Sequence, residues 1–426
     1  MRILLIVVYF SPSTTSAARM MRDLALEYAK QGHEVTVVTP SETVVGPICV
    51  TVEDGITVVR VKTGDLKSAD KLARMWRESR LSKILWAHGM EYFEAHPCDL
   101  IVFYSPSIFL GHLVRRLKSM WHCPAYLILR DIFPKWALDT GVLREGILYR
   151  YLKRIEREQY AVADVIGVEA PGDLPYLHQE LSGGKLRAEV LYNWLGTQET
   201  PVGASGWRQK LELDGKVVFF YGGNIGVAQD LDNIVRLAEG LRERQDIYFL
   251  LIGSGSEVKR LNREIERRGL VNIGIYPAIS QEEYMECLVE FDVGLISLDS
   301  RLKSNNFTGK LLGYILCAKP VLASVRAGHD LIQVLREYNA GIGCANGMDS
   351  ELRAAAVQLA SDSEMRLRMG ANARDLGDRI FSVEVIAKQI VSHFKREEDR
   401  KQGAGQATRR TLGESAPLPV SPEAKL

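Results

Sequence analysis

Three short segments in the second half of the chain combine residue types that bind phosphate groups. Each follows an apolar, strand-like run and places glycine beside hydroxyl, amide or ammonium side chains. In chain order they supply Gly222, Gly223 and Asn224, then Gly253 and Ser254, then Asn305, Asn306, Thr308, Gly309 and Lys310. Glycine permits close backbone approach, and a helix that begins after the turn directs free N–H groups and partial positive charge toward it. One such turn alone is typical of a simple tight connection, but the three together predict a diphosphate site with Lys310 as its charge.

The elements that must position these segments alternate between strand and helix patterns. Residues 3–10 form a continuous apolar run, residues 16–31 repeat apolar side chains at helical spacing, and residues 32–40 (GHEVTVVTP) supply a second strand. Further strand-like runs lie at 99–103, 125–129, 164–168 and 189–191, and a second series lies at 216–221, 247–252, 272–276, 292–297 and 320–323. The pattern predicts an α/β protein with two Rossmann-like, doubly wound parallel sheets, whose ligands bind at the carboxyl ends of the strands.

Composition places the domain boundaries. The stretch 196–206 (GTQETPVGASG) is poor in large apolar residues and is the best interior linker. We therefore predict an N-terminal domain over residues 1–195, a C-terminal domain over 196–380 and a terminal helix over 381–400. Residues 401–426 lose apolar content and gain Gly, Pro, Ser and charge, which is typical of a disordered tail.

Charge and cysteine usage exclude several functional classes. The 426 residues carry 54 basic and 53 acidic side chains, a balance that is atypical of a nucleic-acid binder. The six cysteines are scattered without a CxxC pair, so they predict neither a zinc ribbon nor a disulfide framework, and they suit a reducing cytoplasm. No Asp-X-Asp pair occurs at a strand end, so we predict no metal site. No apolar run approaches the roughly 18 residues of a transmembrane helix, so any membrane association is peripheral.

Two basic and aromatic stretches in the first half suggest such an association. Residues 66–90 read as one long helix with six Lys or Arg against two acids, interleaved with Trp76 and Trp86. A second patch follows at Arg115, Arg116, Lys118 and Trp121. A basic amphipathic helix with tryptophans can lie on an anionic membrane surface, and an ordinary solvated surface helix is the alternative.

Several motifs resemble those of a known family. They are GHEVTVVTP, YGGNIGVAQDLDNIV (residues 221–235) and GKLLGYILCAKPVLAS (309–324), together with RDIFPKWALDTGVL (130–143), YNW (192–194) and NNFTGKLLGY (305–314). The first three resemble the GT-B glycosyltransferases, and among them the retaining nucleotide-sugar transferases of family four. The others resemble the WbuB-like N-acetyl-L-fucosamine transferases of bacterial O-antigen and capsule assembly. The resemblance covers roughly residues 1–395.

This resemblance implies a UDP-sugar donor on the C-terminal half and an acceptor on the N-terminal half. Many family members carry an arginine and a lysine where this chain has Asn224 and Gln229, so the contacts these two make with the donor would be uncharged. A pair of glutamates is replaced by Asn305 and Gly313, and a His-Asp pair is replaced by Arg130 and Asp131.

Because the usual charged residues are replaced, the resemblance leaves other charged residues to stabilise the leaving group. Lys310 and Arg130 are the candidates to stabilise departing UDP, and Asp131 is expected to orient Arg130 or the acceptor. The alternatives are a solvated lysine at a helix start and an ordinary ion pair at a strand end. His329 either contacts the donor or lies beside a helix cap made by Asp330.

The resulting prediction is a cytoplasmic, membrane-associated retaining transferase. It would move N-acetyl-L-fucosamine or a related 6-deoxy amino sugar from UDP to an undecaprenyl-diphosphate-linked sugar, without a metal or other cofactor. A UDP-sugar 2-epimerase of the same fold and a catalytically inactive scaffold are the alternatives. A dinucleotide-dependent oxidoreductase is disfavoured because the first strand-to-helix turn lacks GxGxxG.

Overall fold

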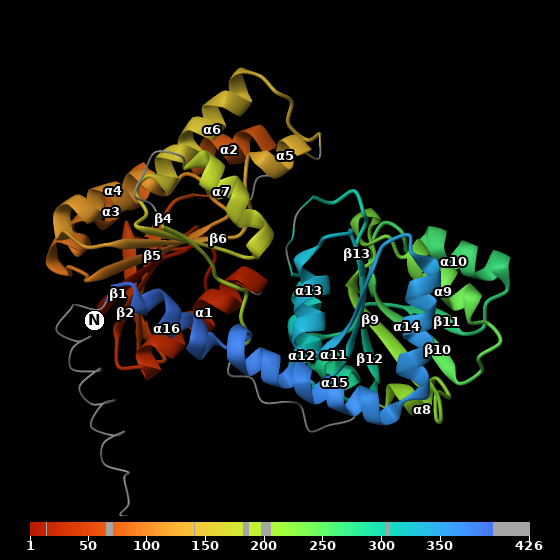
Figure 1. The fold of residues 1–426 in the computed structure, drawn as a ribbon. Coiled ribbons are helices and arrows are strands. Elements are labelled where there is room, and N and C mark those ends of the chain that lie inside the picture. The colour runs from red at the N-terminus through yellow and green to blue at the C-terminus, as the bar shows by residue number, and fades with distance from the viewer. Residues whose placement is uncertain are drawn as a thin grey trace, which may run out of the picture.

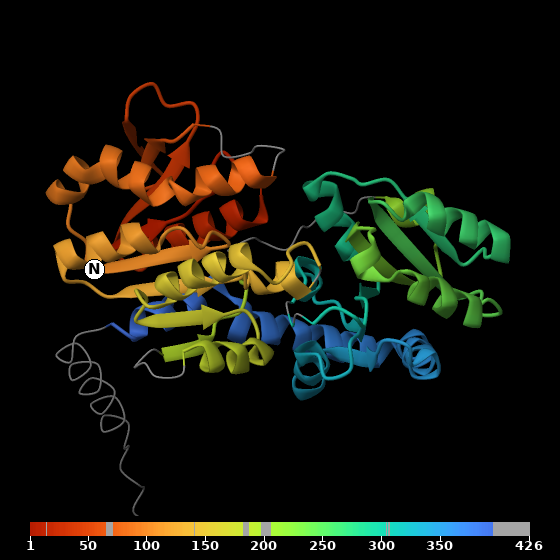
Figure 2. The same ribbon diagram turned by 90° about the horizontal axis from the view of Figure 1, so that it is seen from above.

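The computed structural model describes residues 1–13, 15–64, 71–139, 141–181, 187–196, 206–303, 305 and 307–394. The chain forms two sheets, each flanked by helices, that lie side by side (Figures 1 and 2). The first has eight strands in the order β3-β4-β2-β1-β5-β6-β7-β8, and the second has six in the order β11-β10-β9-β12-β13-β14. The structure confirms the prediction of two Rossmann-like parallel-sheet domains.

The N-terminal sheet is parallel except for the β3–β4 hairpin. Its strands are β1 (Arg2–Ile6), β2 (Glu34–Ser41), β3 (Ile48–Glu53), β4 (Ile56–Lys62), β5 (Leu100–Ser105), β6 (Ala125–Leu129), β7 (Val165–Val168) and β8 (Arg187–Val190). Its helices are α1 (Ser16–Lys30), α2 (Lys71–Ser79), α3 (Leu81–Ala95), α4 (Gly111–Trp121), α5 (Lys135–Asp139), α6 (Ile147–Tyr160) and α7 (Leu174–Glu180). Ile3 and Leu5 enter one hydrophobic cluster and Leu4 and Ile6 another, because both faces of the sheet are covered.

The C-terminal sheet is parallel in every described pairing. Its strands are β9 (Val217–Asn224), β10 (Ile247–Ser254), β11 (Ile273–Tyr276), β12 (Val293–Ser297), β13 (Val321–Val325) and β14 (Gly341–Ala345). Its helices are α8 (Trp207–Lys210), α9 (Asp232–Gly240), α10 (Val258–Arg268), α11 (Gln281–Glu290), α12 (Gly309–Leu316), α13 (Asp330–Glu337), α14 (Asp349–Ser361) and α15 (Ser363–Leu376). The edge strand β14 was not predicted from the sequence.

The last helix returns to the first domain. After α15 the chain passes through Gly377–Phe381 and enters α16 (Val383–Ser392), which packs beside α1. Ile386 and Ile390 are buried in the same cluster as β1 and α1 residues. At the crossing, the Leu195 N–H donates to the Phe381 carbonyl at 2.6 Å, and the Val383 N–H donates to the Leu195 carbonyl at 3.0 Å. The described chain therefore links the domains here as well as through the linker region.

The prediction of one long helix over residues 66–90 is wrong for the described part. The structure has two helices, α2 and α3, with Arg80 between them. Directly after the break, Leu81, Ser82 and Leu85 are buried in the core, where the Ser82 hydroxyl donates to the Phe109 carbonyl at 2.5 Å. Residues 66–70 lie outside the described part of the chain. Within that part, no helix is both long and apolar enough to cross a bilayer.

Two of the tryptophans predicted to lie at a membrane surface pack inward instead. Trp86 and Trp121 both contact the buried ring of Phe93, at centroid distances of 6.4 and 6.2 Å. The Trp121 indole N–H also donates to the Phe93 carbonyl at 3.0 Å. Trp76, by contrast, is 61% exposed. Trp86 and Trp121 are therefore partly buried against the core of the N-terminal domain.

Candidate functional site

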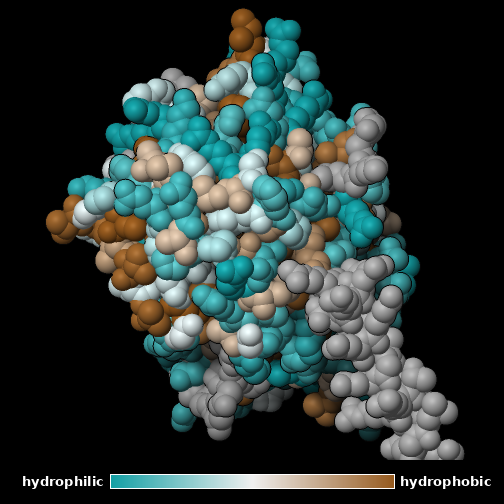
Figure 3. Space-filling model, turned by 90° about the vertical axis from the view of Figure 1, so that its left-hand side faces the viewer, coloured by the Kyte–Doolittle hydropathy of each residue, from teal (hydrophilic) through white to brown (hydrophobic). Residues whose placement is uncertain are grey.

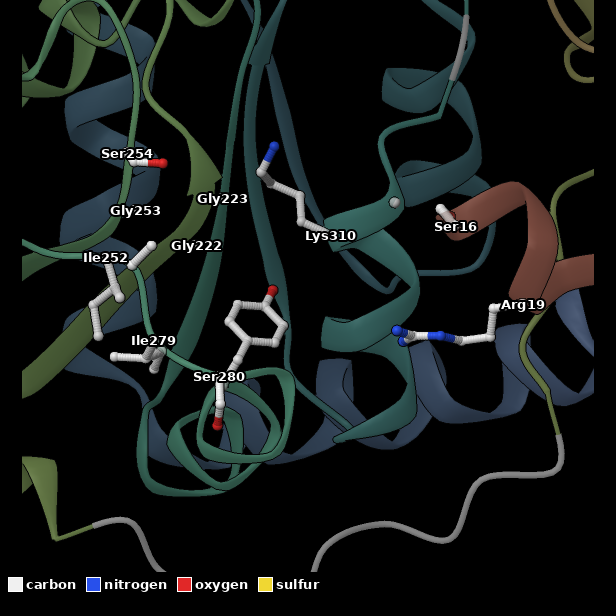
Figure 4. Close-up of a pocket in the computed structure, with 13 residues that line it drawn as sticks. Ser16, Arg19, Gly222, Gly223, Ile252, Gly253, Ser254, Ile279, Ser280 and Lys310 are labelled. Carbon is white, nitrogen blue, oxygen red and sulfur yellow. The ribbon is translucent and has the colours of Figure 1, made fainter. Parts of the chain in front are cut away.

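A cavity of about 530 Å³ lies where the two domains face each other. Six residues predicted for donor binding line it together: Gly222, Gly223, Gly253, Ser254, Gly309 and Lys310 (Figure 4). They come from the carboxyl ends of β9 and β10 and from the start of α12. Ser16 and Arg19 of α1 line the same cavity from the N-terminal domain. We call this space the donor cavity.

Bare backbone forms the floor of the donor cavity. β9 and β10 pair in parallel so that Gly253 lies opposite Gly223. A Cβ atom at Gly253 would come within 1.8 Å of the Gly223 carbonyl oxygen, and Gly223 itself has a φ of +126°. Any larger side chain at these positions would collide or strain the backbone. The glycines therefore leave the floor of the cavity free of side chains, and their predicted role in binding a phosphate stays a prediction.

Lys310 supplies a positive charge at this floor. It lies in the first turn of α12, and its ammonium lies 4.7 Å from the centre of the Tyr221 ring. If Gly223 carried a Cβ atom, that atom would lie 3.8 Å from the Cε of Lys310. Among the described residues Lys310 forms no ion pair, and burial lowers its pKa to about 8. A half-buried ammonium without a carboxylate partner is suited to an incoming anion.

Arg19 is a site residue that the sequence reasoning missed. It extends from α1 toward α12 in Figure 4, on the opposite side of the donor cavity from the glycine turns. The available signal was an arginine in the first turn of the helix that follows β1.

Asn224 and Gln229 do not line the donor cavity. The Asn224 Nδ2 donates to Gln229 Oε1 at 3.0 Å, and the same oxygen accepts the Gly226 N–H at 3.1 Å. The two amides therefore hold the turn after β9 closed on itself. Their predicted contact with a donor has no geometric support in this arrangement, because their polar atoms are directed at each other.

Arg130 and Asp131 line a different cavity, of about 280 Å³. Its wall includes Lys135, Trp136 and Asp173 of the N-terminal domain, and Leu302 and Lys303 of the C-terminal domain also contribute. We call it the carboxylate cavity. The prediction that Arg130 and Lys310 act on one diphosphate is not supported, because the two cations line separate spaces.

Arg130 is held inside the N-terminal domain. Its side chain is 6% exposed and donates to the Leu129 and Tyr192 carbonyls at 3.1 and 3.2 Å. The guanidinium also lies 5.6 Å from the Trp194 ring centre. These contacts hold the Arg130 guanidinium inside the domain, near the surrounding carboxylates. Because Arg130 is buried, the alternative prediction of an ordinary surface ion pair with Asp131 is wrong.

Burial raises the pKa of the carboxyl groups near this cavity. The pKa of Asp173 rises to about 6, first through burial and then through repulsion by Asp330. The pKa of Glu169 rises to about 7 through burial, with Arg130 opposing the rise, and Asp131 is raised for the same reason. Asn193 Nδ2 donates to Glu169 at 2.7 Å. Desolvated carboxyls of this kind gain when a ligand offers them hydrogen-bond donors.

The remaining predicted residues that the structure describes, Asn305, Thr308 and His329, line neither cavity. His329 is 3% exposed and caps α13 itself, since its Nδ1 accepts the Leu331 N–H at 3.1 Å. The predicted cap by Asp330 is wrong, because that carboxylate accepts the Gly172 N–H across the domain interface at 2.7 Å.

The polar atoms of this interface are only partly paired. Asn305 accepts a hydrogen bond from Arg326 at 2.8 Å. Within the described part, His329 Nε2 and Thr308 Oγ1 are buried without a hydrogen-bond partner. Asn306 lies outside the described residues.

Comparison with known proteins agrees with this architecture. Residues 15–194 match the family described as glycosyl transferase 4-like domain, and residues 205–376 match glycosyl transferases group 1. The chain is a glycosyltransferase of the GT-B fold. This transferase is 21% identical over 421 residues to the putative colanic acid biosynthesis glycosyl transferase WcaI of Escherichia coli (strain K12), covering 93% of this chain and 100% of that protein.

A second relative and a solved structure extend the comparison. The transferase is 25% identical over 222 residues to the probable glycosyltransferase WbjE of Pseudomonas aeruginosa, covering 51% of this chain and 55% of that protein. The chain thus spans about half the length of WbjE. HepE of Anabaena, solved in complex with UDP, superposes with a TM-score of 0.62 at 16% identity, covering 92% of this chain and 99% of HepE.

The described residues contain no group of three or more His, Cys, Asp or Glu side chains placed to hold a metal ion.

Proposed function

We propose that this transferase moves a sugar from UDP to an undecaprenyl-diphosphate-linked sugar in bacterial O-antigen or capsule synthesis. The observation that carries the proposal is Lys310, a half-buried ammonium without an ion-pair partner among the described residues, beside bare glycine backbone in the donor cavity. Main-chain donors and one cation suit the diphosphate of a nucleotide sugar.

The reaction follows from where the charges lie. An acceptor hydroxyl attacks the anomeric carbon, a new C–O bond forms, and the bond from that carbon to the phosphate oxygen breaks with its electron pair leaving on UDP. We propose retention of configuration, with the phosphate oxygen on the same face taking the acceptor proton. Lys310 and Arg19 stabilise the charge that develops on UDP, and the protein otherwise positions the reactants.

The carboxylate cavity is the place we propose for the acceptor sugar. Asp131 and Asp173 offer acceptors to sugar hydroxyls, and Trp136 offers an apolar ring face beside them. Leu302 and Lys303 bring the donor domain to the same cavity.

The proposed identity of the donor sugar rests on sequence motifs. RDIFPKWALDTGVL and NNFTGKLLGY resemble segments of N-acetyl-L-fucosamine transferases, so we propose that sugar or a related 6-deoxy amino sugar as the donor. The name of WcaI refers to colanic acid biosynthesis, which is consistent with a polysaccharide pathway. We further propose metal-independent transfer on the cytoplasmic face of the membrane.

One experiment tests the proposal. The protein is incubated with a panel of UDP-sugars and synthetic lipid-diphosphate sugars, with and without EDTA, and products are identified by mass and anomeric configuration. We expect one UDP-sugar to give an acceptor-dependent product whose yield is unchanged by EDTA. A new UDP-sugar formed without acceptor would instead indicate a 2-epimerase. Absence of UDP binding by calorimetry would favour an inactive scaffold.

A further inference from the structure

Exposed apolar side chains gather at one end of the N-terminal domain. We call this surface the α6 tip and define it by Trp76, Trp136, Val142, Ile147, Leu148 and Tyr151. Ile147 is 82% exposed, Val142 56% and Tyr151 54%. α2, α5 and α6 meet at the top of Figure 1, and Figure 3 shows brown hydrophobic residues at that end of the molecule. Exposed apolar patches of this kind mark an interaction surface.

The α6 tip is not the by-product of a loosely packed helix. α6 is anchored by Leu152, which is buried against Ile108 and Phe109. Met75 of α2 and Leu143 pack on the same cluster, so the segments that bear the exposed residues share one support. The first turn of α6 therefore presents Ile147, Leu148 and Tyr151 in addition to a satisfied core face.

The charges beside the tip are mostly positive. Arg144, Arg150 and Arg154 are exposed within the stretch 142–154, and Glu145 is the exposed acid there. Among the described residues Arg144 and Arg150 form no ion pair, whereas Arg154 pairs with Glu158 at 2.9 Å. Apolar side chains inside a basic surround fit a bilayer that carries anionic headgroups.

We propose that the α6 tip docks this transferase onto an anionic lipid bilayer, with its apolar residues inserted at the headgroup boundary and its arginines on the lipid phosphates. The proposal rests on the proposed function, which places the acceptor on a membrane lipid. It relocates the contact from the predicted stretches around Trp86 and Trp121, whose rings pack into the core.

The helix α5 connects the α6 tip to the carboxylate cavity. Trp136 is 44% exposed at the tip and also lines the carboxylate cavity, together with Lys135 and Asp139 from the same short helix. A sugar linked to a bilayer lipid would then meet the acceptor cavity directly beside the membrane surface. Docking through the C-terminal domain would offer no such continuity.

Vesicle co-sedimentation of the full chain tests the docking surface. The probe is vesicles of phosphatidylglycerol and phosphatidylethanolamine, with phosphatidylcholine vesicles as the neutral comparison. The triple variant Ile147→Ser, Leu148→Ser, Tyr151→Ser removes the apolar anchor. The matched control, Val271→Ser with Leu367→Ser, removes two side chains that are 85% and 75% exposed on the C-terminal domain.

We expect the wild type to prefer the anionic vesicles, the triple variant to bind them at least tenfold more weakly, and the control to bind like the wild type. Arg144→Gln with Arg150→Gln should weaken binding and reduce its dependence on salt. Equal vesicle binding by the triple variant would overturn the proposal. So would light scattering that shows a dimer in the wild type and a monomer in the triple variant, since the tip would then join two copies.

UDP calorimetry keeps the two proposals apart. The tip residues lie outside the donor cavity, so the triple variant should bind UDP like the wild type if it is folded. If vesicle binding depends on the tip but no UDP-sugar supports transfer even to a water-soluble acceptor, the docking surface stands and the proposed function fails.

Discussion

The donor cavity and the carboxylate cavity are built from the same kind of strand ends but differ in charge. The charged residues that line the first are cations, whereas three aspartates and the cations Arg130, Lys135 and Lys303 line the second. The first has a floor of glycine backbone with Lys310 and Arg19 as its cations. The second is lined by Asp131, Asp139 and Asp173 beside an aromatic ring, and its buried cation Arg130 is already bonded to carbonyls. The carboxyl edge of a parallel sheet thus fixes where a ligand binds, whereas the side chains set which ligand it is.

The difference between the two cavities also suggests which substrate each one binds. Backbone N–H groups and unpaired cations favour an anion, whereas carboxyls whose pKa burial raises favour a neutral ligand rich in hydroxyl donors. Each cavity therefore suits one substrate of a transfer between a nucleotide sugar and a sugar acceptor. Variants that affect one substrate and spare the other test the contrast.

The largest effect is expected for Lys310→Ala. Loss of the donor-cavity ammonium should lower turnover roughly 100- to 1,000-fold, because leaving UDP loses its main cation. Steady-state transfer assays and UDP calorimetry measure this, and Lys310→Arg serves as the control that keeps the charge. An unchanged melting temperature shows that the fold survives. Wild-type turnover in Lys310→Ala would remove this residue from the site.

Asp173→Asn tests the other cavity. The carboxamide retains the shape of the side chain but loses the charged acceptor, so kcat/KM for the acceptor should fall roughly 10- to 100-fold. UDP affinity should remain unchanged, and this is the readout that a general folding defect would disturb. If Asp173→Asn weakened UDP binding and spared the acceptor, the assignment of the two cavities would be reversed.

Arg19→Ala should weaken UDP binding by about tenfold, less than the loss of Lys310, because the arginine is exposed and water screens its charge. The matched control is Arg22→Ala, one turn along α1, where the guanidinium pairs with Asp54 outside the donor cavity. Calorimetry with both variants separates a local contact from a general charge effect. Equal losses in the two would refute a specific role for Arg19.

The smallest effect is a pH dependence of donor binding. Burial sets the pKa of Lys310 at about 8 in the free protein, and a bound diphosphate must raise it. UDP affinity is therefore full below pH 8 and should fall by about tenfold between pH 7 and 9 as the ammonium loses its proton. Lys310→Arg should flatten this profile over the same range. A wild-type profile that is already flat would mean that Lys310 does not contact the diphosphate.

Much of the fold could be predicted because buried parallel strands appear in the sequence as continuous apolar runs. The runs that became β1, β5 and β10 are examples. The strand β14 was not predicted because its sequence, GIGCA, has few large apolar side chains. It is recognisable as a strand only through its pairing with β13. The break between α2 and α3 at Arg80 was not predicted because the helical spacing of apolar residues continues through it.

By itself the sequence determined the local features of the site: two glycine turns that follow strands and a lysine that begins a helix. These depend on backbone freedom and on residues close in the chain, so they are readable without a fold. Only the tertiary structure decided which charges share a space. It placed Arg19 opposite Lys310, buried Arg130 behind a separate cavity and turned Asn224 toward Gln229. The reason is physical: a charge is paired or left free by neighbours that are distant in sequence, and packing alone brings those neighbours together.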